Sequence, residues 1–499
     1  MIKNKKTVTV SAYVKGHGLS EKAYAMLYAN ARGGGKFKYN QSSRLTAASQ
    51  GGWHKLTVTV KVPETANSLL FGGIVEGAGM YWFDKFEVLI DETPVQDIAS
   101  FLPEVTKSQI KWTNDQLNKI GRTKDVFEVN SNFYHEVADA KILGLGEATH
   151  GTHEFSLLKS QIIQHIATAS DKNVIVAFES AFGAALRIND YIRGGEGDPE
   201  EIVRNISNPW RTIELVEMIR WIREFNRTND NKVLFLGFDM QWPDSEIANL
   251  EKFAESHAKI LTATVSEIRK LSHGIDRYRT DRRVGPKLDS IVAKLKIIGN
   301  LFSEQTRPLD DQARFARHNI DVLSQFIYRL KATGNPSAFR DSCMAANIIW
   351  MADHYPDHQI ILWAHNGHIR KRANWMGYVL KDRFAEDYQA VGFTTFSGTF
   401  SAFNRPHDPE AIPLEAPHPE TYEYWFEKLK YDNWIMNVGK LAQNSVSNWL
   451  GTPRQFTFVG YKKPVETQFS STNVMDEFDH LVFIKNTRHI SYVNPFEDK

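Results

Sequence analysis

The sequence predicts a two-part chain, in which a small all-β sandwich of the jelly-roll type precedes an α/β domain with a mostly parallel sheet flanked by helices. The first part contains short strand-like runs and no helical pattern. The second part alternates solid apolar runs with helical stretches, and a charge-rich helical insertion interrupts that alternation. A length of 499 residues also exceeds one ordinary core, so two or three domains are expected.

Residues 1–97 are predicted to form the sandwich. Runs such as TVTVSAYVKG and WHKLTVTVKVP alternate apolar and polar residues, and clusters of Gly, Pro and Asn separate them. Several short strands at this spacing are typical of a sandwich or jelly roll. The polar segment DETPVQD, residues 91–97, is the predicted exit linker.

Residues 98–499 are predicted to form the α/β domain. Four solid Val, Ile and Leu runs, separated by helical stretches, are KILGLG, NVIVAFES, KVLFLGFDM and QIILWAH. Such strands are buried on both faces, which indicates a parallel sheet covered by helices on each side. Residues 244–333 lack strand-like runs and are highly charged, so we expect two or more long helices that form a lid or cap.

Composition argues against several classes of partner. The 60 basic residues nearly balance the 59 acidic ones, so nothing indicates a nucleic-acid partner or an acidic membrane. No apolar run approaches the ~18 residues of a membrane span. Without a signal peptide the chain is expected to be cytoplasmic, or exported if upstream residues were removed. Cys343 is the single cysteine and is expected to be a buried, unreactive thiol. The oligomeric state is not indicated.

Polar side chains follow each of the four apolar runs. They are, in chain order, Glu147 and His150, then Glu179, then Asp239, then His365, Asn366 and His368. Ligands of open α/β sheets bind outside the carboxyl ends of the strands, so we expect these groups to converge on one site. Each alone has a simpler explanation: Glu147 could cap a helix, a lone His could be structural and Asp239 could belong to a turn. Their joint occurrence favours an active site.

The set offers proton acceptors and donors but no side-chain nucleophile. The G-x-S-x-G elbow, the Walker A loop and the H-E-x-x-H zinc motif are absent. His and Glu suit a water nucleophile, with His as general base and a second His or Lys beside the oxyanion. The same residues could instead hold a divalent metal. If the chain turned into a helix at GEATHG, Glu147 and His150 would share a face and His153 would point away.

The motifs together resemble those of the erythromycin esterase family. They are GLGEATHGTHEF, VAFES, TIELVEMIRWIREFN, RDSCMAAN and WAHNGHI, and the resemblance spans roughly residues 105–490. It implies an α/β core with a helical insertion. It also implies hydrolysis of the macrolactone ester of macrolide antibiotics without a covalent intermediate, and hence a link to antibiotic resistance.

The resemblance, carried over position by position, implies His150 as the base. The expected catalytic residues are His150, Glu147, Glu179, His365 and His368. The expected substrate-binding residues are Lys159, Asp239, Arg340, Asn366 and His153. No metal and no other cofactor are expected.

The β-rich segment before residue 98 departs from the macrolide-inactivating members, and it resembles carbohydrate-binding jelly rolls. Trp53, Tyr81 and Trp82 could stack on a sugar, although core packing is the expectation. The leading interpretation is a carboxylic ester hydrolase whose partner is a small ester or lactone, which could carry sugars. The alternatives are a metal-dependent hydrolase that uses the same cluster and a non-catalytic carbohydrate-binding protein.

Overall fold

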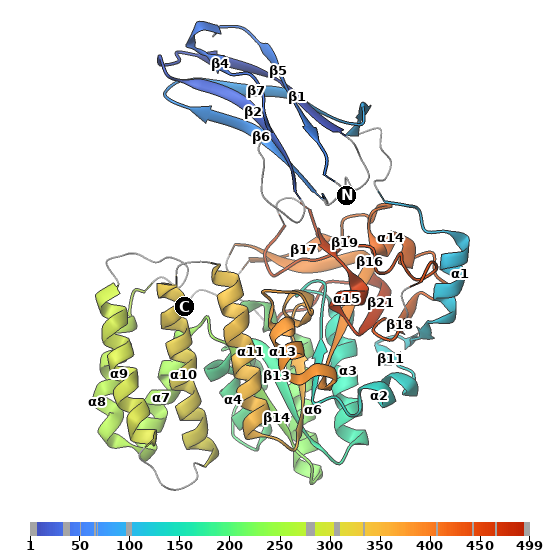
Figure 1. Cartoon of the computed structure of the whole chain (residues 1–499). Coiled ribbons are helices and arrows are strands. Elements are labelled where there is room, and N and C mark those ends of the chain that lie inside the picture. Colours follow the sequence, from blue (N-terminus) through green and yellow to red (C-terminus); the bar gives the residue numbers. More distant parts are fainter. Residues whose placement is uncertain are drawn as a thin grey trace. The chain divides into compact units, whose positions relative to one another are not determined.

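The structure is a computed structural model in which two compact units, Met1–Glu104 and Val105–Lys499, are distinguished (Figure 1). It describes residues 7–32, 40–49, 51–63, 66, 68–95, 102–275, 285–303, 310–332, 335–405, 408–441, 444–464 and 467–493. The boundary expected between residues 97 and 98, and the last two residues of the predicted linker, lie outside the described residues.

The described part of the first unit is a sandwich of two antiparallel sheets. One sheet contains β5 (His54–Lys61), β1 (Thr7–His17), β7 (Met80–Ile90) and β8 (Thr93–Pro94). The other contains β3 (Asn40–Gln41), β2 (Tyr24–Arg32), β4 (Leu45–Thr46) and β6 (Ser68–Glu76). Alternate residues of both sheets, such as Val10, Leu27 and Val58, meet in one apolar core. The all-β unit predicted from alternation is therefore confirmed.

The expectation that Trp53, Tyr81 and Trp82 pack in the core of this unit is wrong for two of them. Trp53 is 48% exposed and Trp82 is 42% exposed. Side chains alternate along β7, so Tyr81 packs against the core while its neighbour Trp82 faces outward. The Tyr81 hydroxyl donates to the main-chain carbonyl of Glu76.

The second unit is built on a sheet of nine strands among the residues described. Its order is β14 (Val233–Asp239), β13 (Asn173–Ala181), β15 (His358–Trp363), β12 (Ile142–Leu145), β16 (Tyr388–Arg405), β21 (His480–Thr487), β18 (Asn433–Asn437) and β9 (Asn118–Lys119), with β17 (Asp408–Pro413) beside β16. The first six strands of this order are parallel to their neighbours, and β9, β17 and β18 pair antiparallel. The mostly parallel sheet is confirmed.

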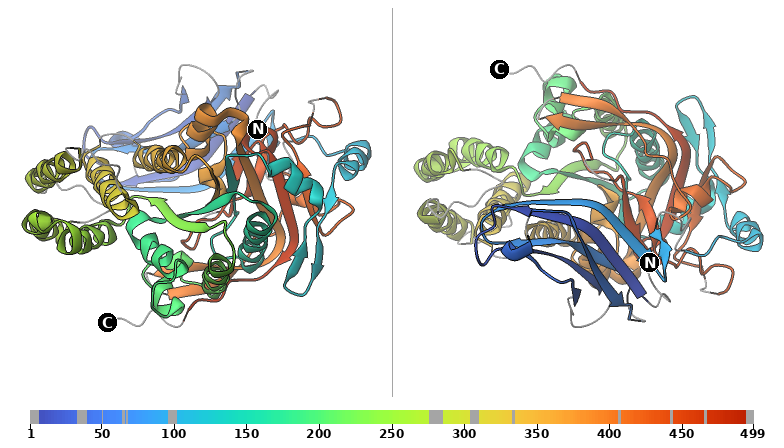
Figure 2. Two further views of the ribbon diagram at one scale, coloured as in Figure 1. Left: turned by 90° about the horizontal axis from the view of Figure 1, so that it is seen from below. Right: turned by 90° about the horizontal axis from the view of Figure 1, so that it is seen from above.

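Helices cover both faces of this sheet (Figure 2). They are α3 (His153–Ala169) and α6 (Ile213–Thr228) on one face, and α11 (Pro336–His354) and α13 (Met376–Phe384) on the other. Successive strand residues join opposite cores: Ile175 packs on the side of α11, and Val176 on the side of α3. This explains why the strands are apolar throughout, because neither side of the sheet faces water.

A helical insertion separates β14 from α11, as predicted. It comprises α7 (Pro243–His257), α8 (Thr262–Ser272), α9 (Gly285–Ser303) and α10 (Asp311–Lys331). These helices share an apolar core of their own that includes Leu250, Leu295 and Phe326. Residues 276–284, 304–309 and 333 of the predicted insertion lie outside the described residues. The carboxylate of Glu246 joins the insertion to the rest of the unit by accepting the N–H of Gly183, 3.0 Å away.

Cys343 is buried in α11, as the sequence predicts. Burial raises the pKa of its thiol to about 12, so almost no thiolate exists at neutral pH to act as a nucleophile. None of the described helices combines the length and apolar character needed to cross a bilayer.

We expect the second unit to fold without the first, because each unit has its own sheets and its own apolar core. A chain of residues 105–499 should unfold in one cooperative transition close to that of the same unit in the full chain, as followed by circular dichroism and calorimetry. Its first helix, α1 (Lys107–Asp115), keeps its capping box between Thr106 and Gln109. Absence of a cooperative transition would show that the first unit completes the core of the second.

Candidate active site

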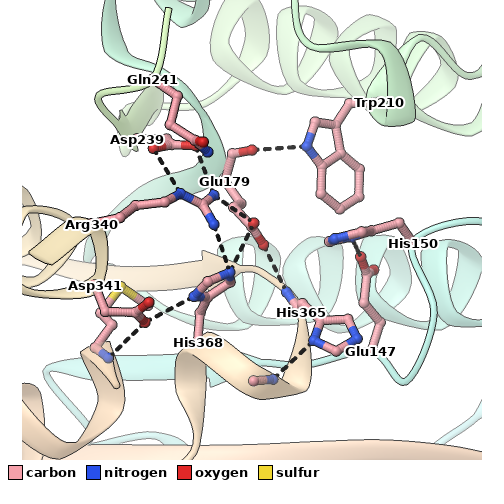
Figure 3. Close-up of polar contacts among 12 residues, drawn as sticks. Glu147, His150, Glu179, Trp210, Asp239, Gln241, Arg340, Asp341, His365 and His368 are labelled. Carbon is pink, nitrogen blue, oxygen red and sulfur yellow. Dashed lines mark hydrogen bonds and ion pairs between the residues drawn. The ribbon is translucent and has the colours of Figure 1, made fainter. Parts of the chain in front are cut away.

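Side chains at the carboxyl ends of four adjacent parallel strands lie in one cluster (Figure 3). Glu147 follows β12, Glu179 lies near the end of β13, Asp239 ends β14 and His365 follows β15. These strands are neighbours in the order β14-β13-β15-β12, so their ends meet at one edge of the sheet. Helix α11 and the short α12 (Asn366–Ile369) add Arg340 and His368.

Glu147 bonds to His150 through one carboxylate oxygen and to Lys159 through the other. Its Oε1 lies 2.7 Å from Nδ1 of His150, and its Oε2 accepts from Nζ of Lys159. The contact expected between Glu147 and His150 is present, but it does not form on a helix, because α3 begins only at His153 and the contact lies within the preceding loop.

Lys159 contacts Glu147 from the interior of the protein, and its side chain is not exposed to solvent. Its side chain is fully buried, and its Nζ also lies 4.2 Å from the centre of the Trp363 ring. Burial lowers the pKa of Lys159 to about 8, although the Glu147 carboxylate opposes that shift. The lysine is therefore placed to orient Glu147.

His150 keeps one ring nitrogen free. Glu147 accepts the proton on Nδ1, which leaves the lone pair on Nε2. Among the described residues, Nε2 of His150 has no hydrogen-bond partner. The Trp210 ring packs edge-on against the imidazole at 4.7 Å and the His365 ring lies 5.1 Å away, so the imidazole is held in place.

Arg340 binds the carboxylates of Asp239 and Glu179 and lies next to His368. Its Nε and Nη2 donate to the two oxygens of Asp239 at 3.1 and 2.7 Å, and Nη2 also donates to Oε1 of Glu179 at 2.9 Å. Its Nη1 lies 3.0 Å from Nε2 of His368. Burial alone would lower the pKa of Arg340, but Asp239 and Glu179 raise it well above its usual value. The guanidinium is therefore charged at every accessible pH.

His368 is bonded at both ring nitrogens. Nδ1 lies 2.8 Å from Oδ1 of Asp341, which also accepts the N–H of Met376 at 2.9 Å. Nε2 lies 3.2 Å from Oε1 of Glu179. Burial favours the neutral ring, but Glu179 and Asp341 outweigh it and raise the pKa of His368 to about 9. The ring therefore carries a proton on each nitrogen at neutral pH.

His365 is bonded to the main chain through both ring nitrogens. Nδ1 accepts the N–H of Gly367 at 3.0 Å, and Nε2 lies 3.2 Å from the carbonyl oxygen of Ala148. Its own main-chain N–H donates to Oε2 of Glu179 at 2.9 Å. Burial lowers the pKa of His365 well below its usual range, so the ring is neutral. His365, which follows β15, is therefore bonded both to the loop after β12 and to the end of β13.

Two of the expected residues lie outside the cluster. Asn366 donates to the carbonyl of Phe393 at 2.7 Å and accepts its N–H at 3.1 Å, so its side chain bonds to β16. The two ring nitrogens of His153 lie 2.6 Å from Oε1 of Glu214 and 2.8 Å from Nη2 of Arg488. Neither side chain contacts the groups around Glu179.

Sequence reasoning missed two members of the cluster. Asp341 binds Nδ1 of His368. The only signal for it in the sequence was its position directly after Arg340, an expected site residue. Trp210 donates from Nε1 to the carbonyl of Glu179 at 2.8 Å and packs on His150. It lies in a short 3₁₀ turn (Asn208–Trp210), away from any strand end, and nothing in its local sequence marks it.

The donor set does not fit a metal ion. In the part of the chain that the structure describes, no group of three or more His, Cys, Asp or Glu side chains is arranged to hold one. The carboxylates that could bind a cation already have protein cations beside them: Lys159 at Glu147, and Arg340 at Glu179 and Asp239.

Comparison with known proteins identifies the family. The erythromycin esterase family model matches residues 174–487, which is more than half of the chain. Erythromycin esterase type II of Escherichia coli is 24% identical over 304 residues, covering 53% of this chain and 71% of that protein. The putative hydrolase YbfO of Bacillus subtilis (strain 168) is 22% identical over 376 residues, covering 64% and 79%.

Solved structures share the fold. A succinoglycan biosynthesis protein matches with a TM-score of 0.68 at 20% identity, covering 78% of this chain and 99% of that one. A mutant of the erythromycin esterase EreC in its open conformation matches with a TM-score of 0.57 at 19% identity, covering 74% and 97%. The resemblance inferred from the motifs is confirmed, and the chain belongs to the erythromycin esterase family of hydrolases.

Proposed function

We propose that this protein hydrolyses a carboxylic ester or lactone with a water molecule that His150 activates, and without a covalent intermediate. One observation carries the proposal: of the histidines in the cluster, His150 is the one with a ring nitrogen that has no partner among the described residues. Its family supports an esterase activity. The names of the relatives support the macrolactone of a macrolide as the first substrate to test.

The first step is the attack of water on the ester carbonyl. Nε2 of His150 takes a proton from the water while its oxygen forms a bond to the carbonyl carbon. Glu147 accepts the Nδ1 proton throughout, so it fixes the tautomer and stabilises the imidazolium that forms. Lys159 holds the other oxygen of Glu147 and keeps that carboxylate aligned.

The second step is collapse of the tetrahedral intermediate. Its negative oxygen needs positive charge nearby, and Arg340 and His368 are the cations whose side chains reach the surface of the cluster, at 17% and 11% exposure. When the ester bond breaks, the imidazolium of His150 returns its proton to the departing alkoxide. Water has then supplied the hydroxyl of the acid and the hydrogen of the alcohol, and His150 is neutral again.

The first prediction concerns the base. His150→Gln keeps a side chain that can donate to Glu147 but removes the basic ring nitrogen that takes the proton from water. Turnover should therefore fall by about 10²- to 10⁴-fold. We would measure hydrolysis of a small soluble ester by the full chain. The control is His165→Gln, an exposed histidine of α3 outside the cluster, with no expected loss. His153→Ala should have a mild effect. If His150→Gln kept more than about a tenth of the turnover, the general base would have to lie elsewhere.

The second prediction concerns metal ions. Because lysine and arginine already neutralise the carboxylates of the cluster, hydrolysis should continue at an unchanged rate after exhaustive treatment with a strong chelator. The assay would compare treated and untreated protein, with and without added zinc or manganese. Activity that disappears on treatment and returns with either metal would establish the metal-dependent alternative.

The third prediction concerns stability and pH. The folded state raises the pKa of His368 from its ordinary 6.5 to about 9, so this residue stabilises the fold fully below pH 6.5 and loses that contribution as pH rises through 9. The contribution is on the order of 3 kcal/mol, because a tenfold change in proton affinity corresponds to about 1.4 kcal/mol. Denaturant unfolding of wild type and His368→Gln should show a stability difference that shrinks across this range. A difference that stays constant with pH would contradict the assignment.

A further inference from the structure

Two half-buried aromatic rings flank the histidines of the cluster and take no part in the proposed chemistry. The Phe458 ring stands perpendicular to the His365 ring, with centres 4.5 Å apart. The Trp375 ring lies 5.7 Å from the His368 ring, and the two aromatic rings are 6.2 Å apart. They therefore form an apolar border next to a group of charged side chains.

The main chain fixes both rings relative to the reacting groups. The N–H of Val459, next to Phe458, donates to the carbonyl of Ala148 at 2.7 Å, in the loop that carries His150. The N–H of Met376, next to Trp375, donates to the carboxylate of Asp341 at 2.9 Å. Each ring is thus one residue away from a hydrogen bond to the site itself.

Other groups fill the space behind the rings. The buried guanidinium of Arg370 lies over both, 4.2 Å from the centre of Trp375 and 4.9 Å from that of Phe458, and it pairs with Glu477 at 3.5 Å. Gly367 lies so close that an added Cβ would be 2.8 Å from Cζ of Phe458 and 3.0 Å from Cζ3 of Trp375. Arg370 and Gly367 therefore restrict the movement of both rings, and because both rings are only half-buried, each keeps part of its apolar surface exposed.

We propose that Trp375 and Phe458 bind the non-reacting part of the ester substrate and select for substrates with a bulky apolar ring. The proposal rests on the hydrolytic function proposed above and adds the chemistry of the ligand. Neither ring contacts a reacting group that it could protonate or polarise, whereas rigid aromatic surfaces bind apolar matter well. A large lactone ring can cover both aromatic rings while its ester lies at His150, and a small ester cannot. Binding of that remote part then contributes to catalysis.

The test uses the full chain and two cyclic esters of different size, ε-caprolactone and a macrolactone. We would measure kcat and KM for wild type, Trp375→Leu and Phe458→Leu, since leucine preserves apolar packing but removes the aromatic surface. The loss in kcat/KM on the macrolactone should exceed the loss on ε-caprolactone by at least about tenfold and lie mainly in KM. Trp221→Leu is the matched control, because Trp221 is a half-buried tryptophan stacked on Phe225 in α6.

Each possible outcome either supports or contradicts the proposal. Equal losses on the two esters would assign the rings a structural role, and no loss on either would show that substrate does not touch them; both results overturn the proposal. A wild-type chain that hydrolyses ε-caprolactone but neither hydrolyses nor binds the macrolactone would also overturn it, while the hydrolytic function would stand. If neither ester were hydrolysed, the hydrolytic function would fail, and calorimetric binding of the macrolactone that weakens in both variants would still support the apolar subsite.

Discussion

The buried carboxylate of Glu179 is the constraint from which the rest of the cluster follows. Burial opposes its charge, but the imidazolium of His368 and the guanidinium of Arg340 hold its pKa well below the usual range. A buried charge must be paired and hydrogen-bonded. Arg340 pairs with this carboxylate, and Asp239 binds the same guanidinium. His368 also pairs with the carboxylate, and Asp341 binds the other ring nitrogen of His368. The carboxylate also accepts the main-chain N–H of His365, so it fixes the neighbouring strand end.

A buried ionic network of this kind is weak evidence for stability. Replacing a buried ionic network with apolar residues of similar volume often leaves a protein equally or more stable. Four carboxylates, a lysine, an arginine and three histidines nevertheless lie together at the edge of this sheet. The apolar cores on both faces of the sheet hold these groups in place, since the strands that carry them are buried throughout. The packed strands therefore keep buried charged groups at the edge of the sheet that would be unfavourable without their partners.

The sequence predicted what depends on periodicity and missed what depends on contacts through space. Solid apolar runs had to be strands buried on both faces, and residues that follow parallel strands had to meet, so Glu147, Glu179 and Asp239 could be assigned to one edge. The partners of these residues could not be predicted. Asp341 and Trp210 reach the cluster from a helix and a 3₁₀ turn whose positions depend on packing. The loop geometry at His150 was equally hidden, because no local pattern distinguishes it from the first turn of a helix.

The three histidines of the cluster show how hydrogen bonding divides roles among identical side chains. His365 bonds to the main chain through both nitrogens and is neutral, whereas His368 donates from both nitrogens to carboxylates and is charged. A ring with two bonded nitrogens cannot take a proton from water without first losing a bond, whereas a ring with one bonded nitrogen is oriented and still basic. A general base must meet the second condition. This supports the proposal that His150 is the base, because Glu147 binds Nδ1 and no described residue binds Nε2.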